Sequence, residues 1–217
     1  MKTIVAVILG LGLMPGCHFN FNFNSIPGSG NRKSEVRQVA QFRTLQIRGA
    51  ADVRGHVGQK QNLTVEIDDN LLDIITTEVD EDTLSISSSE SYSSRKGLKV
   101  EINVEQLDRV IVQGSGDINL DGLHGDSFEV EVNGSSDVIA TGDVKNLKIT
   151  IRGSGDVDLT KVKALSVEVS IAGSGDVQVH ASESLNVTIR GSGDVRYSGN
   201  PTLRKRILGS GDVRHID

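Results

Sequence analysis

IRGSGDVDL, residues 151–159, contains the unit Gly-Ser-Gly-Asp-Val, which recurs along the second half of the chain. Copies and close variants begin at residues 114, 134, 153, 173, 191 and 209, and a looser copy, GAADV, begins at residue 49. The steps between the six regular copies are 20, 19, 20, 18 and 18 residues. A period of this length is too short for a pair of helices and is typical of one coil of a β-solenoid.

Apolar residues alternate with polar residues on both sides of each unit. Val169 and Ile171 precede the copy at residue 173, for example, and Val177 and Val179 follow it. This alternation predicts strands with one buried face. One coil cannot bury that face alone, so coils stacked about 4.8 Å apart are expected to share an aliphatic core. The sequence therefore predicts an all-β fold, a right-handed parallel β-helix or β-solenoid with coils of about 18–20 residues.

The first glycine of each unit is expected to have a structural role. The chain turns a corner in every coil, and residues at such corners often need a positive φ or a close approach to the coil above. The last coil differs because Lys205 stands where earlier coils have valine or isoleucine, so residues 203–217 are expected to form a terminal cap. The corner glycines are Gly114, Gly134, Gly153, Gly173, Gly191 and Gly209.

Stacking also predicts a column of aspartates. Neighbouring carboxylates about 5 Å apart repel each other by about 0.9 kcal/mol in water, so the column needs a compensating interaction. Three interpretations are open: hydrogen bonds from amides of the turns, bridging cations, and a ridge that contacts a protein or glycan partner. The spacing differs from that of calcium-binding nonapeptide repeats, so we assign no metal site and no cofactor. The column is Asp117, Asp137, Asp156, Asp176, Asp194 and Asp212.

The N-terminus has the features of a processing signal. Lys2 precedes an apolar run at residues 3–13, which is too short to span a bilayer, so residues 1–16 are interpreted as a signal peptide. Cys17, the sole cysteine, follows Gly16 in an arrangement that resembles the lipobox of bacterial lipoproteins. The alternative is an ordinary signal peptide with an incidental cysteine. We expect a lipidated N-terminus and tether at residues 17–36, and a single solenoid domain at residues 37–217.

Composition and motifs argue against several functional classes. The net charge of -6 provides no basic field for nucleic acid. The five histidines are scattered, and no GxSxG, HExxH or P-loop motif is present, so we expect no enzyme. Some polysaccharide lyases use parallel β-helices, which leaves a polysaccharide-active enzyme as the least favoured alternative.

Three segments of the first half carry a family resemblance: FRTLQIRGAADVRGHVGQ at 42–59, LTVEIDDNLLDIITTEVDEDTLSIS at 63–87 and LKVEINVEQLDRVIVQGSGDINL at 98–120. With the coils that follow, they resemble the putative auto-transporter adhesin head GIN domain family. The resemblance implies a β-helical solenoid, a location in the bacterial envelope and no established catalytic residues.

These observations together predict a non-catalytic envelope lipoprotein whose adhesin-like solenoid head serves surface display or binding. The lipobox resemblance implies a lipid anchor at Cys17, and we expect the protein in the cell envelope of a Gram-negative bacterium. Residue 18 is histidine rather than the aspartate that retains lipoproteins in the inner membrane, which favours the outer membrane. Expected partners are the membrane through the anchor and a glycan or an envelope protein, with a homo-oligomer also open. The alternative function is an envelope-maintenance or sensing lipoprotein that binds another envelope protein.

Overall fold

The computed structural model of the chain describes residues 25–217. The signal peptide at residues 1–16 and the lipidation of Cys17 lie outside the described residues and stay predictions. The described residues carry sixteen strands, one 3-10 helix and a continuous hydrophobic core. A segment with its own core has what a domain needs to fold as a unit. Within it, there is no helix long and apolar enough to cross a membrane.

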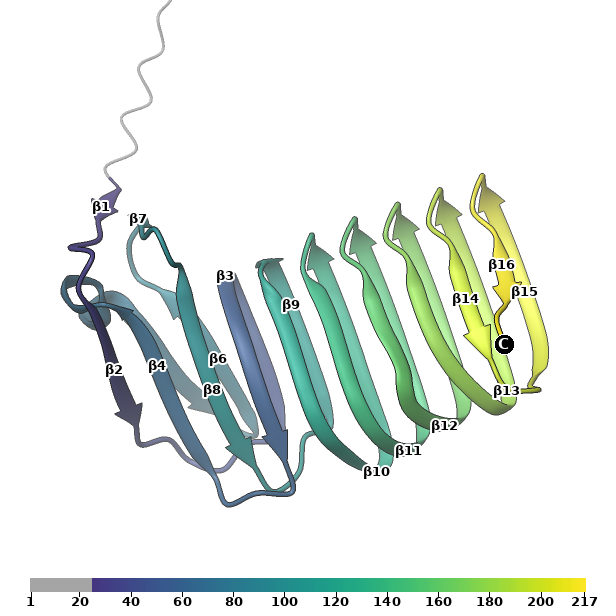
Figure 1. Cartoon of the computed structure of the whole chain (residues 1–217), viewed down its shortest axis with the longest axis horizontal. Helices are drawn as coiled ribbons and strands as arrows, with labels where there is room; N and C mark the ends of the chain where they lie inside the picture. Colours follow the sequence, from purple (N-terminus) through teal and green to yellow (C-terminus); the bar gives the residue numbers. More distant parts are fainter. Residues whose placement is uncertain (1–24) are drawn as a thin grey trace, which may run out of the picture.

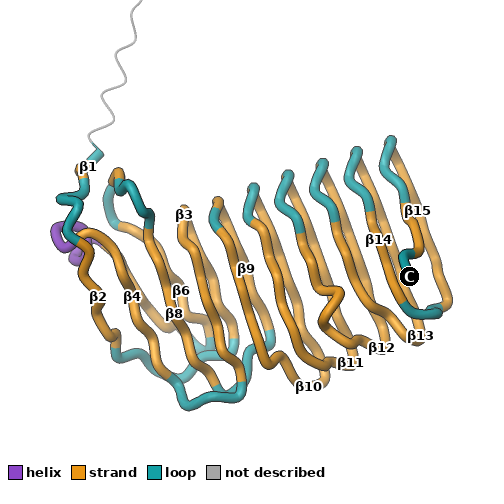
Figure 2. The backbone as a smooth tube through the Cα atoms, viewed as in Figure 1, coloured by secondary structure: helices purple, strands orange, loops and turns teal. Residues whose placement is uncertain are grey.

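The repeats wind into a β-solenoid in which the Gly-Ser-Gly-Asp corner joins two strand segments in every coil (Figures 1 and 2). On the opposite edge of the solenoid the chain bends while remaining extended. A single long strand therefore runs from one corner to the next. These long strands are β10 (Asp117–Gly134), β11 (Asp137–Gly153), β12 (Val157–Gly173) and β13 (Val177–Gly191). The shorter β9 (Arg109–Ser115) precedes them, and the shorter β14 (Val195–Ser198), β15 (Thr202–Gly209) and β16 (Val213–His215) follow them.

The strand segments form two layers that pack against each other. We call the segments that end at a corner glycine layer A, and the segments that begin after a corner layer B. Neighbouring coils pair in parallel, and each corner glycine lies beside the corner glycine of the next coil, from Gly114 to Gly209. This register confirms the predicted β-solenoid and its stacked columns.

The core between the layers is aliphatic. Val130 and Val132 enter it from layer A, and Ile118 and Leu120 enter it from layer B, each no more than 3% exposed. Burying such a side chain contributes roughly 1.5–3 kcal/mol, so every coil adds to the stability of its neighbours. The column of buried side chains in layer A ends at Lys205, which pairs with Val187 and is exposed.

The N-terminal third closes one end of the solenoid with antiparallel strands. In layer A, β6 pairs in parallel with β3, and β5 is antiparallel to β6. In layer B, β8 pairs in parallel with β3, and β4 and β2 continue the sheet in antiparallel pairs. A 3-10 helix, η1, buries Leu71 and Leu72 over the end of the core. The elements are β1 (Ile26–Pro27), β2 (Arg32–Arg37), β3 (Thr44–Val57), β4 (Asn62–Asp68), η1 (Asp69–Ile74), β5 (Ile75–Asp80), β6 (Thr83–Ser88), β7 (Tyr92–Ser93) and β8 (Leu98–Val104).

The expected boundary between tether and domain at residues 36 and 37 is wrong. β1 pairs with β7, and β2 pairs with β4 along its whole length, so residues 26–36 belong to the head. The Arg32 side chain fixes this segment by donating to the carbonyls of Gly97 and Glu66 at 2.7 and 2.9 Å. Gly28 and Gly30 do interrupt the extended chain, but the strand resumes after them because β4 offers an unpaired edge.

The corner glycines are required by the packing of successive backbones. Gly173 has a φ of +147°, and a Cβ on it would lie far inside van der Waals contact with the carbonyl oxygen of Gly153. That oxygen accepts a hydrogen bond from the Ser174 amide at 2.9 Å, so the backbones cannot move apart without losing it. This close approach supports the structural role predicted for these glycines. Gly49, in the first corner, has a φ of +109° but has no atom within 4 Å of the same position.

Substituting Gly49 and Gly173 allows the cost of backbone strain to be measured separately from the cost of a steric clash. Gly49→Ala incurs only the conformational strain, for which we expect a loss of about 1–3 kcal/mol in the free energy of unfolding. Gly173→Ala adds the clash with the coil below, so its loss is expected to exceed about 4 kcal/mol. Urea unfolding of residues 25–217 measures both values. Equal losses for the two variants would contradict the close approach of the coils.

Candidate functional site

The repeats place the serines and aspartates of the units along one edge of the solenoid, which we call the corner ridge. Its serines, Ser115 through Ser210, are exposed at every coil. The aspartates form one column, as predicted, and their carboxylates bond to the next coil. In each of these contacts the backbone amide of an aspartate donates to Oδ1 of the aspartate before it. The pairs are Asp156 to Asp137 at 3.1 Å, Asp176 to Asp156 at 2.8 Å, Asp194 to Asp176 at 2.8 Å and Asp212 to Asp194 at 2.9 Å.

These hydrogen bonds offset the repulsion between neighbouring carboxylates in the column. A carboxylate that accepts an amide hydrogen bond has a dipole directed at its charge, which favours the ionised form. Cations add to this at the C-terminal coils: Arg214 Nε lies 2.6 Å from Asp212 Oδ2, and Arg196 lies 3.6 Å from Asp176. The hydrogen bond from Arg214 lowers the pKa of Asp212, with the Val213 amide as the next cause. Hydrogen bonds within the protein therefore stabilise the negative charge of the corner ridge.

The chain of hydrogen bonds is interrupted between Asp117 and Asp137, although the Asp117 amide donates in the same way to Asp52 Oδ1 at 3.3 Å. Asp117 pairs with Asp137 in the register, yet the Asp137 amide donates to the carbonyl of Gly116 at 3.2 Å. The interruption falls at the variant unit GSSDV, where Ser136 replaces the second glycine and is fully buried. Within residues 25–217, no group of three or more His, Cys, Asp or Glu side chains is placed to hold a metal ion. A cation or a partner on the outer carboxylate oxygens stays a prediction.

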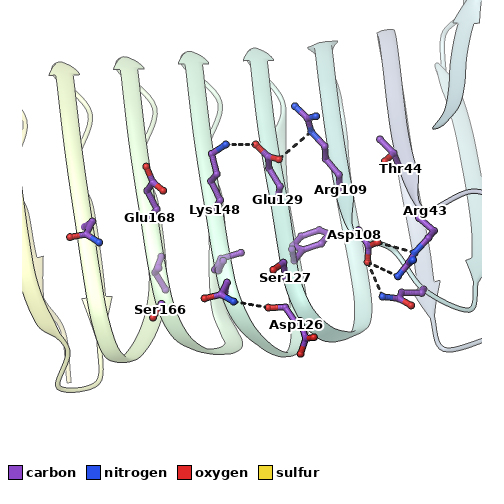
Figure 3. Close-up of a pocket in the computed structure, with 16 residues that line it drawn as sticks. Arg43, Thr44, Asp108, Arg109, Asp126, Ser127, Glu129, Lys148, Ser166 and Glu168 are labelled. Carbon is purple, nitrogen blue, oxygen red and sulfur yellow. Dashed lines mark hydrogen bonds and ion pairs between the residues drawn. The ribbon is translucent and has the colours of Figure 1, made fainter. Parts of the chain in front are cut away.

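A second site lies on the outer surface of layer A. It is a groove of about 730 Å³ that crosses β3, β9 and the layer A segments of β10–β13 (Figure 3). One register row through the groove alternates in charge, because Arg109, Glu129, Lys148 and Glu168 lie side by side on successive strands. Thr44 and Asn186 continue the row on either side. Stacking thus converts one position of the repeat into an ordered line of charges.

Ion pairs fix most of this row. Lys148 Nζ lies 2.8 Å from Glu129 Oε1, and this hydrogen bond raises the pKa of Lys148. Arg109 Nε lies 3.4 Å from Glu129 Oε2, so Glu129 is held from both sides. Glu168 is exposed and has no ion pair within 4 Å among the described residues. The row is therefore rigid at its centre and has an unpaired carboxylate on the side of the C-terminal coils.

Glu131, two residues beyond Glu129 on β10, binds side chains of both neighbouring strands beside the groove. Glu131 receives hydrogen bonds from Asn133, Arg109 and Arg152, and its oxygens lie 2.8 Å from Arg109 Nη2 and 2.6 Å from Arg152 Nη1. The hydrogen bond from Asn133, followed by those from the two arginines, lowers the pKa of Glu131 despite its partial burial. Glu131 thus ties β9, β10 and β11 together beside the groove.

At the N-terminal end, Asp68 marks a smaller cavity of about 380 Å³ that is also lined by Gly28, Ser93 and Arg95. Asp68 is 3% exposed, and its Oδ1 accepts the amide of Gly30 at 3.0 Å. Its Oδ2 has no hydrogen-bond partner among the protein groups of the described chain. A Cβ on Gly28 would collide with this oxygen, so a side chain at position 28 would displace the Asp68 carboxylate.

The groove was not predicted from the sequence. Its residues hold ordinary polar positions of the strands, and none belongs to the repeated unit. The signal was nevertheless present, because aligning the repeats places Arg109, Glu129, Lys148 and Glu168 at the same position, three residues before the last buried residue of each layer A strand. Charges that alternate in sign down one column of a stacked repeat indicate an ion-pair ladder.

Comparisons with known proteins agree with this architecture. The family model described as "Putative auto-transporter adhesin, head GIN domain" matches residues 41–201. A structure described as a putative adhesin from Bacteroides fragilis NCTC 9343 is similar with a TM-score of 0.70 and 25% identity, covering 88% of this chain and 100% of that one. A putative adhesin from Parabacteroides merdae ATCC 43184 shares the fold at a TM-score of 0.59 and 18% identity, covering 89% and 99%.

A third similar structure is described as a putative lipid binding protein from Parabacteroides distasonis ATCC 8503. Its TM-score is 0.52 at 25% identity, and the match covers 89% of this chain and 100% of that one. No curated protein matches the chain.

The hydrogen-bonded column makes a prediction that distinguishes charge from hydrogen bonding. Asp176→Asn keeps an acceptor for the Asp194 amide and removes one repelling charge, so its free energy of unfolding is expected to equal or exceed that of the wild type. Asp176→Ala removes the acceptor, and we expect a loss of about 1–3 kcal/mol.

Thermal unfolding with calcium and with a chelator completes the test. The hydrogen-bonded column predicts no calcium-dependent shift in either variant or in the wild type. A large calcium-specific stabilisation of the wild type that Asp176→Asn abolishes would instead make the column a metal site.

Proposed function

The chain belongs to the head GIN domain family of putative auto-transporter adhesins, and from this premise we propose that it is a non-catalytic, lipid-anchored envelope protein. In this proposal the solenoid is the binding head and Cys17 carries the anchor. The groove on layer A is the surface that meets the partner.

The alternating row in the groove is the observation that carries this proposal. Glu129 and Lys148 are held by hydrogen bonds before any partner arrives, so binding does not have to order them. Glu168 remains exposed for contact with a cationic group. A preorganised, charged groove on a stacked sheet suits recognition rather than chemistry, which also supports a non-catalytic role.

The lining favours a protein over other partners. Its one aromatic side chain, Phe128, is 1% exposed and offers no face on which a sugar ring could stack. Its apolar side chains, Phe128, Leu147 and Val167, are buried, and its other lining side chains are charged or polar, which are poor partners for acyl chains. We therefore place an envelope protein with complementary charges first, ahead of a glycan.

The position of the N-terminal strands is compatible with an anchor at Cys17. β1 and β2 lie at one end of the solenoid and β15 and β16 at the other (Figure 1). The eight residues from Cys17 to Asn24 span at most about 29 Å when extended, so the N-terminal end would stay near the membrane. Cys17→Ala is expected to move the protein from the membrane fraction to the soluble fraction. Unchanged membrane association in that variant would argue against the lipid anchor.

The groove is tested by site-specific photo-crosslinking in cells that express the full chain. A photoreactive residue at position 168 is expected to capture one protein in stoichiometric amounts, because Glu168 projects from the open part of the row. A matched probe at position 139, which is 47% exposed on layer B, controls for unspecific capture. Equal capture at both positions would show that the groove is not the binding surface. Polysaccharide adducts at position 168 would show that the partner is a glycan rather than a protein.

A further inference from the structure

Layer A ends in two strands that each have one unpaired edge. β15 pairs only with β13, and β5 pairs only with β6, so each leaves a row of backbone N–H and C=O groups without a strand partner. β5 lies beyond β6 at the N-terminal end of the solenoid, and β15 lies at the C-terminal end, where Figure 1 labels it. Exposed edges of this kind are templates for pairing with another chain.

The two edges carry opposite charges. On β15, Arg204, Lys205 and Arg206 are consecutive and exposed. On β5, Glu78 and Asp80 are exposed, and Glu81 and Asp82 follow at once in the turn to β6. Among the described residues, neither the arginines of β15 nor the two acids of β5 take part in an ion pair within 4 Å. Both sets of charges are therefore free to meet a partner.

The register of the sheet aligns these charges. Strand by strand through β6, β3, β9 and β10–β13, Asp80 falls in the same column as Arg204, and Glu78 falls in the same column as Arg206. A second copy placed beyond β15 by continuing the sheet would thus bring Asp80 opposite Arg204 and Glu78 opposite Arg206. Because β5 runs antiparallel to its layer, the new pair would be antiparallel, with the two acids at the spacing of the two bases.

We propose that two copies of this chain associate head to tail, with β5 of one copy adding to β15 of the other. The contact is heterologous, because each copy offers a different edge, so it can repeat along a row of copies. In layer B the same register puts Arg214 in the column of Val36. β16 is only three residues long, so layer A carries most of the junction.

Lys205 limits the strength of the contact. It occupies the inward column of Val187, and in the junction it would face Val79. The ammonium group of Lys205 keeps the unpaired edge of β15 hydrated, as expected of a residue in the terminal cap. The association is therefore reversible and sensitive to salt. Attachment of many copies to one membrane would raise their effective concentration.

Charge exchange between the edges tests the proposal on purified residues 25–217 by sedimentation velocity over a range of protein and salt concentrations. Wild-type protein is expected to form concentration-dependent dimers and larger species that salt dissociates. Arg204→Glu with Arg206→Glu is expected to weaken association at least about tenfold, and Glu78→Lys with Asp80→Lys to do the same. An equimolar mixture of the two double variants is expected to restore association, because each then presents the edge that complements the other.

Lys60→Glu with Lys161→Glu is the matched control, since both lysines are exposed and lie outside β5 and β15. It changes the net charge as much as the arginine variant does and is expected to associate like the wild type. Circular dichroism verifies that each variant is folded. A wild type that is monomeric at every concentration, or a mixture that associates no more than its components, would overturn the proposal.

Discussion

The close approach of backbones at the corner is the constraint on which the rest of the structure depends. At each coil a glycine with positive φ brings its Cα against the carbonyl of the glycine below, and the next amide donates to that carbonyl, as Ser174 does to Gly153. The Val157 amide then donates to the carbonyl of Asp176 in the coil above. Any side chain at the glycine would separate the coils and break these bonds together. The repeated unit is thus a stacking device, and its aspartate contributes an acceptor for the following coil.

Because the corner and the inward valines fix the stacking, the side chains at outward positions can vary without disturbing it. Each outward position of one coil becomes a row on the finished solenoid. One such row in layer A forms the Arg109–Glu129–Lys148–Glu168 line of the groove, and the ends of the same layer carry the acidic and basic edges. Binding and self-association can therefore change through surface substitutions without altering the fold.

The repeated features could be predicted from the sequence, because aligning six copies of the unit shows which positions recur in every coil. The corner glycines, the inward Val169 and Ile171 and the aspartate column all follow from aligning the copies. The N-terminal third could not be predicted in the same way. β2 joins the domain through antiparallel pairing with β4, a contact between segments about thirty residues apart that no local pattern around Pro27 and Gly28 reveals. The groove was missed because its charges are unremarkable until the register places them side by side.

Native-state hydrogen exchange of the corner amides tests the stacking account most directly. Ser154, Ser174 and Ser192 have exposed side chains, but their amides donate to the glycine carbonyl of the coil below at 2.9 Å. The account predicts that these amides exchange as slowly as the core amide of Val169, since opening a corner requires separating the coils. Exchange at the rate of an ordinary surface turn, while the core strands stay protected, would contradict the claim that the corners hold the coils together.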